Sequence, residues 1–254
     1  MSADPAAPIL QMRAVRKTFA GFTAVRVLDL NVKRGTIHAL IGPNGAGKTT
    51  VFNLATKFHQ PTSGQIFFKG IDITTTSPSK VARLGMVRSF QISAIFASLS
   101  ALENVRIALQ RKRNDSFAFW RSERVLSVHD EQARDLLTQV GLDDVRDSQA
   151  GELPYGRRRA LELATTLALD PELLLLDEPM AGLGQEDVAR IAQLIRRVAA
   201  HRTIVMVEHN LSIVADLSDY ITVLARGEVL SEGSYEQVSR DPAVIEAYVG
   251  TEDA

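Results

Sequence analysis

The chain has 254 residues, of which 45% are hydrophobic and 23% are charged, so it can bury a full core and is not disordered as a whole. Its net charge of −1 argues against binding to nucleic acid or to anionic lipid, and the absence of cysteine excludes disulfides, thiolate nucleophiles and Cys-ligated zinc. The sequence predicts neither a secretory signal nor a membrane-spanning helix, so we expect contact with a membrane only through a partner.

The predicted strands fall into two classes. Residues 9–19 (ILQMRAVRKTF) and 27–35 (VLDLNVKRG) alternate apolar and polar side chains, which predicts antiparallel strands with one covered face. Residues 36–42 (TIHALIG) are almost wholly apolar, as are residues 172–179 (ELLLLDEP) and 203–209 (TIVMVEH). Because such runs are typical of parallel strands covered by helices on both faces, these three segments predict a central sheet.

A glycine-rich segment, IGPNGAGKTT at residues 41–50, follows the first apolar strand and precedes a predicted helix at 49–58. It satisfies the pattern G-x-x-x-x-G-K-[ST], in which glycines let main-chain N–H groups turn inward around phosphate oxygens. The N-terminus of the following helix adds positive potential at the same place. The alternative is a glycine-rich turn beside a solvated lysine, which leaves the flanking strand and helix without a role. The predicted nucleotide-binding residues of this loop are Gly42, Pro43, Asn44, Gly45, Ala46, Gly47, Lys48, Thr49 and Thr50.

Two side chains of this loop have specific expected roles. Lys48 is expected to reach the β- and γ-phosphates of ATP. The Thr49 hydroxyl is expected to ligate Mg²⁺, which prefers oxygen ligands and keeps several waters. The sequence therefore predicts ATP and Mg²⁺ at this loop.

Residues 98–151 are predicted to form a helical insertion. Within it, DEQARDLLTQVGL places four apolar residues at helical spacing before Gly141, which is expected to end the helix; the four are Ala133, Leu136, Leu137 and Val140. Residues 241–250 (DPAVIEAYVG) predict a short terminal helix that begins at Asp-Pro and ends at Gly250.

Two carboxylates, Asp177 and Glu178, end the second apolar strand, where an α/β sheet presents its ligand-binding edge. Asp177 is expected to contact Mg²⁺ through water, and Glu178 to polarise the attacking water. A strand that ends in Asp-Glu is common by itself, so the prediction depends on the phosphate loop that precedes it in the chain.

Several segments together resemble ATP-binding cassette (ABC) ATPases over about Ile9 to Gly250. GPNGAGKTT, RSFQ, LPYGRRRALELATTLALDPELLLLDEP and VMVEHN look like the phosphate loop, glutamine loop, signature segment, Walker B strand and histidine loop of that family, in the same order. The resemblance implies that Phe19 and Val25 contact adenine, that Gln91 touches Mg²⁺ and the attacking water, and that His209 contacts the γ-phosphate. Taken one by one, Phe19 is typical of a core aromatic, Gln91 of a surface amide and His209 of a structural histidine. The ordered set of motifs favours the functional roles.

The signature segment of the family acts on the nucleotide of a partner cassette. The resemblance implies this role for Leu153, Pro154, Tyr155, Gly156 and Arg157. Pro154 departs from the family, which carries Ser there, so up to two donors to a charged oxygen are lost, each worth about 1.5–3 kcal/mol. Gly184 also departs, because the family commonly has Asp or Asn there. These departures predict an asymmetric heterodimer in which this chain's own phosphate loop belongs to the stronger hydrolytic site.

Within ABC cassettes, VFNLATKFHQPTSGQIFFKG, LENV, Tyr155 and VIEAYVG resemble the branched-chain (hydrophobic) amino acid importer ATPases. Urea-importer and lipopolysaccharide-exporter ATPases are similar relatives. The resemblance implies a second ATPase subunit, transmembrane permease subunits and a place at the cytoplasmic face of the membrane. Three alternatives stay open: a P-loop phosphotransferase, a mechanical ATPase acting on DNA or ribosomes, and a cassette that binds ATP without turnover.

The expected fold is an α/β P-loop NTPase core with a mainly parallel central sheet, an N-terminal antiparallel β subdomain and an inserted α-helical subdomain. We expect one ABC ATPase domain over residues 1–254. Residues 9–91 and 161–235 are predicted to form the nucleotide-binding core, 92–160 the helical subdomain with the signature, and 236–254 a helical tail.

Overall fold

The structure is a computed structural model that describes residues 7–89, 95–112 and 129–249. The chain divides into two compact units. The sheet unit comprises Met1–Arg88, Glu172–Pro179 and Arg196–Ala254, and the helical unit comprises Ser89–Pro171 and Met180–Ile195. Compared with the predicted subdomain boundaries, this division adds residues 89–91, residues 161–171 and Met180–Ile195 to the helical unit.

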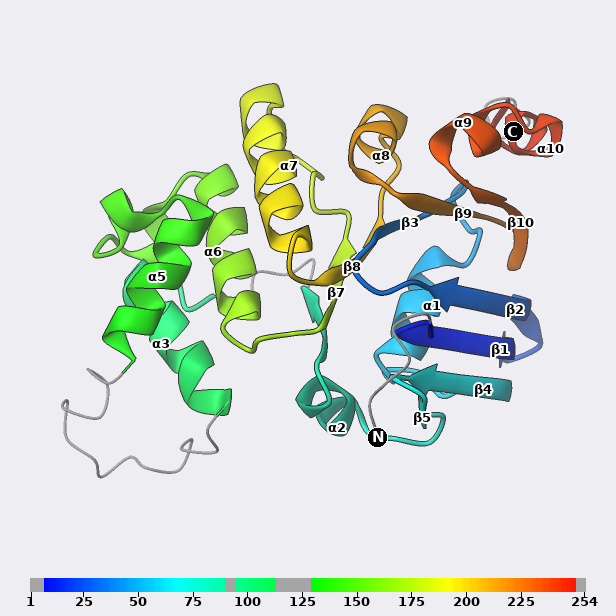
Figure 1. The fold of residues 1–254 in the computed structure, drawn as a ribbon, viewed down its shortest axis with the longest axis horizontal. Helices are drawn as coiled ribbons and strands as arrows, with labels where there is room; N and C mark the ends of the chain where they lie inside the picture. Colours follow the sequence, from blue (N-terminus) through cyan, green and yellow to red (C-terminus); the bar gives the residue numbers. More distant parts are fainter. Residues whose placement is uncertain (1–6, 90–94, 113–128, 250–254) are drawn as a thin grey trace. The chain divides into compact units, whose positions relative to one another are not determined.

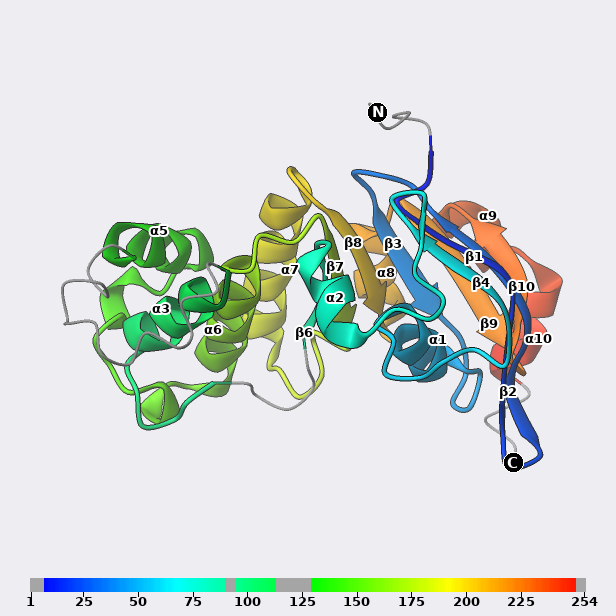
Figure 2. The same ribbon diagram turned by 90° about the horizontal axis from the view of Figure 1, so that it is seen from below.

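The sheet unit contains two sheets (Figures 1 and 2). The four-stranded sheet has the order β2-β1-β4-β5, and the six-stranded sheet has the order β10-β9-β3-β8-β7-β6. The strands are β1 (Leu10–Phe19), β2 (Phe22–Val32), β3 (Ile37–Ile41), β4 (Ser63–Phe68), β5 (Ile71–Asp72), β6 (Met86–Ser89), β7 (Leu173–Asp177), β8 (Thr203–Val207), β9 (Tyr220–Ala225) and β10 (Glu228–Gly233).

The helices of the sheet unit are α1 (Lys48–Ala55), α2 (Pro78–Arg83), α8 (Leu211–Leu217), α9 (Tyr235–Ser239) and α10 (Pro242–Val249). Those of the helical unit are α3 (Ala101–Lys112), α5 (Asp130–Val140) and α6 (Tyr155–Leu167), with short 3₁₀ turns η1 (Asp143–Val145) and η2 (Ala150–Glu152). Helix α7 (Gln185–Ala199) belongs partly to each unit. Within the residues described, no helix is both long and apolar enough to cross a membrane.

The predicted pairing of the strands is confirmed. The three apolar segments form β3, β7 and β8, whose residues are all buried, and β8 pairs in parallel with both β3 and β7. The two alternating segments form the antiparallel pair β1 and β2. However, β2 begins at Phe22, five residues before the predicted start at residue 27. Ala20 (φ 40°) and Gly21 (φ 92°) both adopt positive φ in the connecting turn, as in tight hairpins, so pairing extends to Phe19 and Phe22.

One hydrophobic core joins the two sheets and α1. It contains side chains from β1, β2 and β4, from the parallel strands β3, β7 and β8, and from α1, whose Phe52 is 1% exposed. Because this core holds α1 against both sheets, the loop between β3 and α1 is fixed at each end.

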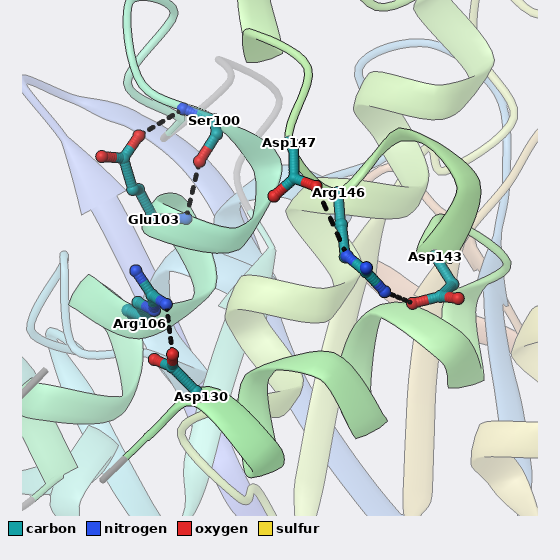
Figure 3. A network of polar contacts seen from close by, with 7 residues as sticks. All are labelled: Ser100, Glu103, Arg106, Asp130, Asp143, Arg146 and Asp147. Atoms are coloured by element: carbon teal, nitrogen blue, oxygen red, sulfur yellow. Dashed lines mark hydrogen bonds and ion pairs between the residues drawn. The ribbon is translucent and has the colours of Figure 1, made fainter. Parts of the chain in front are cut away.

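Helices α3, α5 and α6 pack against one another in the helical unit. All four residues predicted on the apolar face of α5 are buried, and Gly141 ends the helix at φ 75°. Figure 3 shows the polar contacts that order this unit: Ser100 and Glu103 form reciprocal side-chain to backbone hydrogen bonds of 2.7 and 3.2 Å at the start of α3, and Arg106 pairs with Asp130 of α5. Arg146 pairs with Asp143 and Asp147 in the turn that follows (Figure 3).

The central sheet contains a buried histidine whose titration affects stability. The His38 Nε2 atom lies 2.8 Å from the Thr222 hydroxyl, which itself donates to Glu232. Burial, aided by the charge of Lys33, lowers the pKa of His38 from 6.5 to about 4. Since the unfolded chain therefore binds the proton more tightly, this histidine contributes stability above pH 6.5 that is lost as the pH falls toward 4.

We expect this effect to cost about 2 kcal/mol of unfolding free energy between pH 7.5 and pH 5. Urea unfolding of the wild type and of His38→Gln at both pH values measures it. The change in unfolding free energy between the two pH values should be smaller by that amount in His38→Gln, because the carboxylates that both proteins share affect them equally. An equal pH dependence in the two proteins would contradict the assignment.

Candidate functional site

The glycine-rich segment forms a loop between β3 and α1, as the sequence predicts. Gly42, Gly45 and Gly47 adopt positive φ angles of 148°, 79° and 102°. A Cβ at Gly47 would lie 2.7 Å from the carbonyl oxygen of Ala24, so only glycine fits there. Gly47 is also the N-cap of α1, and no side chain among the described residues caps that end. The free N–H groups at this helix terminus therefore fit an anionic phosphate group.

Lys48 turns its ammonium group back onto the loop. The Lys48 Nζ atom donates hydrogen bonds of 2.6 and 3.0 Å to the carbonyl oxygens of Gly42 and Pro43. Burial lowers the pKa of Lys48, while the charges of Glu178 and Asp177 act in the opposite direction. Both carboxylates thus lie within electrostatic reach of the lysine, and the structure brings these three predicted residues together.

The two carboxylates have different surroundings at the end of β7. Asp177 is 5% exposed and forms an ion pair with Arg88. Glu178 is partly exposed and adopts φ 48°, a strained conformation for a residue other than glycine, while its N–H donates to Val207 at 3.0 Å. The His209 Nδ1 atom lies 4.0 Å from the Glu178 carboxylate. A partly exposed carboxylate beside a histidine is suited to orienting a water molecule.

The residues expected at adenine lie on β1 and β2. Phe19 is 37% exposed. The Lys17 ammonium lies 4.7 Å from the centre of the Phe19 ring, and the His59 ring makes a T-shaped contact with it. Val25 is 1% exposed and belongs to the core. Phe19 is thus partly exposed but already contacts Lys17 and His59, whereas Val25 supports the sheet behind the loop.

The signature segment lies at the start of α6 in the helical unit. Leu153 is buried, Pro154 is the N-cap, and no side chain of the described residues caps this helix. The Tyr155 hydroxyl donates to Ala181 at 3.4 Å, and a Cβ at Gly156 would collide with the carboxylate of Asp187 on α7. The remaining signature residue, Arg157, pairs with Asp144 at 2.8 Å, and Gly184 is exposed.

Clustered donors for a divalent ion are few within residues 7–89, 95–112 and 129–249. Among the described residues, no three His, Cys, Asp or Glu side chains cluster closely enough to hold a metal. Thr49 is exposed at the start of α1, and Asp177 is paired with Arg88. Because these two residues supply few oxygens, they fit a cation such as Mg²⁺ that takes most of its ligands from phosphate and water. Gln91, the third predicted ligand, lies outside the described residues.

Sequence reasoning missed Arg88, which lies beside Asp177, and Tyr248, which lies near the glycine-rich loop. Arg88, on β6, pairs with Asp177 and donates a 2.6 Å hydrogen bond to Asn53 of α1. An available signal was that Arg88 follows the apolar pair Met86-Val87, which places it at the end of a strand. Tyr248 of α10 was also missed: burial raises the pKa of Tyr248, and the backbone N–H of Gly42 acts in the opposite direction, so the terminal helix reaches the loop.

Comparisons with known proteins agree with this geometry. Residues 25–181 match the family model described as "ABC transporter", and residues 228–254 match "Branched-chain amino acid ATP-binding cassette transporter". The chain is 38% identical over 253 residues to the high-affinity branched-chain amino acid transport ATP-binding protein BraF of Pseudomonas aeruginosa, covering 96% of this chain and 98% of that protein. It is 35% identical over 255 residues to LivG of Escherichia coli, with the same coverage.

A solved structure shows the same fold. The crystal structure of the ADP conformation of an ATP-binding cassette of an ABC transporter matches with a TM-score of 0.84 and 28% identity, covering 96% of this chain and all of that one. The expected P-loop NTPase fold is confirmed. The chain belongs to the ABC transporter family as an ATP-binding subunit with the ATPase fold, closely related to the branched-chain amino acid transport ATPases.

Proposed function

We propose that this chain hydrolyses ATP to power an importer of branched-chain or other hydrophobic amino acids. The observation that supports this most strongly is the convergence of Lys48, Asp177, Glu178 and His209 beside an uncapped helix terminus. The similarity of this chain to BraF and LivG supports the proposed class of transported substrate, because the names of both proteins specify branched-chain amino acid transport.

In the proposed reaction, the N–H groups of the loop and α1 hold the β- and γ-phosphates, and Lys48 exchanges its carbonyl partners for phosphate oxygens. Glu178 accepts a hydrogen bond from the attacking water and orients it toward the γ-phosphorus. His209 and Gln91 contact the γ-phosphate and the water, and Phe19 stacks on adenine. Mg²⁺, held through Thr49 and Asp177, would neutralise charge on the phosphates.

The proposed assembly is a pair of cassettes bound to transmembrane permeases at the cytoplasmic face of the membrane. The core subdomains 9–91 and 161–235 bind the nucleotide, and residues 92–160 present the signature to the partner's nucleotide. ATP contacts both cassettes only when the pair is closed. ATP binding therefore favours closure, and hydrolysis lets the cassettes part. Tyr248, on helix α10 of the proposed tail, lies near the loop residue Gly42.

A substitution at Pro154 tests the nucleotide site that this chain's signature segment would complete on the partner cassette. Pro154→Ser restores a hydroxyl and an N–H at the N-cap of α6, so ATP turnover of the assembled transporter should rise about tenfold, since each charge-assisted donor contributes about 1.5–3 kcal/mol. The same cap should stabilise the isolated chain by about 0.5–2 kcal/mol. Pro154→Ala is the matched control, because it supplies the N–H without the hydroxyl. Unchanged turnover in Pro154→Ser would refute the proposed weak site.

The transported class is tested by uptake. Cells lacking this chain should take up radiolabelled leucine, isoleucine and valine poorly, and the wild-type gene should restore uptake while Lys48→Ala should not. Urea uptake and lipopolysaccharide export, measured in the same cells, test the related ABC systems. Normal leucine, isoleucine and valine uptake without this chain, together with a defect in either of the other two, would overturn the proposal.

A further inference from the structure

Arg88 is a nearly buried cation at the metal-binding carboxylate expected from the sequence. Its guanidinium pairs with Asp177, and the two side chains are 11% and 3% exposed. A second nitrogen of Arg88 donates a 2.6 Å hydrogen bond to the Asn53 side chain, and the guanidinium carbon lies 5.6 Å from the centre of the Phe52 ring. The group therefore connects β6, β7 and α1, the helix that follows the phosphate loop.

Asp177 already has a cationic partner without a metal ion. Among the described residues, Arg88 pairs with Asp177, and Lys48 lies within electrostatic reach of both Asp177 and Glu178, so two cations already act on these carboxylates. An unpaired carboxylate buried this deeply would be strongly destabilising, so Arg88 satisfies Asp177 in the nucleotide-free chain. A divalent ion arriving alone would add two positive charges next to two existing ones, whereas a metal-ATP complex brings its own negative charge.

We propose that Arg88 is a positioning residue that holds Asp177 in the metal-free site and makes divalent-metal binding depend on the nucleotide. This inference rests on the proposed role of Asp177 toward Mg²⁺. Through Asn53 the same guanidinium fixes the carboxylate relative to α1, so the loop and Asp177 keep one geometry before the metal enters.

Binding of Mn²⁺ alone, followed by electron paramagnetic resonance as a probe for Mg²⁺, tests the proposal. In the nucleotide-free chain, Arg88→Met should tighten Mn²⁺ binding about tenfold, which corresponds to about 1.4 kcal/mol, because a competing positive charge is removed. Arg88→Lys keeps the charge and should remain close to the wild type. An Mn²⁺ affinity in Arg88→Met equal to that of the wild type would overturn the proposal.

Arg159→Met is the matched control. Arg159 pairs with Glu162 at 3.0 Å, with side chains 11% and 9% exposed, so its removal breaks an ion pair of similar burial in the helical unit. Its Mn²⁺ affinity should equal that of the wild type. A tightening as large as that of Arg88→Met would show a general effect of charge loss and would overturn the local role.

Stability provides a second measurement in case Arg88→Met does not fold. Asp177→Asn leaves Arg88 without its carboxylate, so its thermal midpoint should fall, and adding Arg88→Met to it should restore part of the loss. A double variant no more stable than Asp177→Asn would overturn the pairing argument. Failure of the wild type to bind Mn²⁺ even with ATP would instead refute the proposed metal role of Asp177, so the two failures are distinguishable.

Discussion

Glu178→Gln should lower ATP turnover about 10²–10⁴-fold while leaving ATP binding within a few-fold of the wild type. The amide matches the carboxylate in size and shape but cannot accept the proton of the attacking water. The strained φ of 48° at Glu178 does not depend on its charge, so the backbone of the site should persist. Steady-state phosphate release and equilibrium binding of a fluorescent ATP analogue separate the two effects.

Glu172→Gln is the control for this prediction. Glu172 immediately precedes β7 and pairs with Lys69 and Arg34, so it lies at the opposite end of the strand from Glu178. Its loss should leave turnover within about twofold, as expected for exposed ion pairs. If Glu178→Gln kept more than a tenth of the wild-type turnover, another group would have to activate the water.

Lys48→Ala should weaken ATP binding about 100-fold or more, because charge-assisted hydrogen bonds to phosphate contribute about 1.5–3 kcal/mol each. The fold should tolerate the change. Within the described part of the chain, the ammonium donates hydrogen bonds to two loop carbonyls, and burial lowers its pKa, so its removal relieves a partly desolvated charge. Isothermal titration with magnesium-ATP and the thermal midpoint measure the two quantities.

Lys80→Ala, on the surface of α2, provides the matched loss of a lysine in the same unit. It should bind ATP like the wild type. Equal affinities for Lys48→Ala and the wild type would contradict the assignment of the phosphate loop.

The loop and its strand were predictable because their sequence signals are local. A buried β3, the glycines with positive φ and the start of α1 each follow from residues a few positions apart. The same holds for α5, whose four apolar residues share one helical face. The hairpin of β1 and β2 was only partly predicted, because Ala20 adopts a positive φ that its residue type does not favour.

The surroundings of the carboxylates were not predictable in the same way. Arg88 and Asp177 are 89 residues apart in the sequence, and only the sheet order that places β6 beside β7 brings them together. Likewise, the proximity of His209 to Glu178 depends on the pairing of β7 with β8, and not on any spacing along the chain. Tertiary pairing, and not local propensity, determined these contacts.

Phosphate release by the transporter assembled with this chain tests the central claim most directly. The account predicts magnesium-dependent release of one phosphate per ATP into water, without any acceptor molecule, and its loss when Lys48→Ala is combined with a partner cassette made inactive. Retention of ATP without release would show a cassette that binds without turnover. Transfer of phosphate only to an added acceptor, or release that persists after Lys48→Ala in that assembly, would contradict the account.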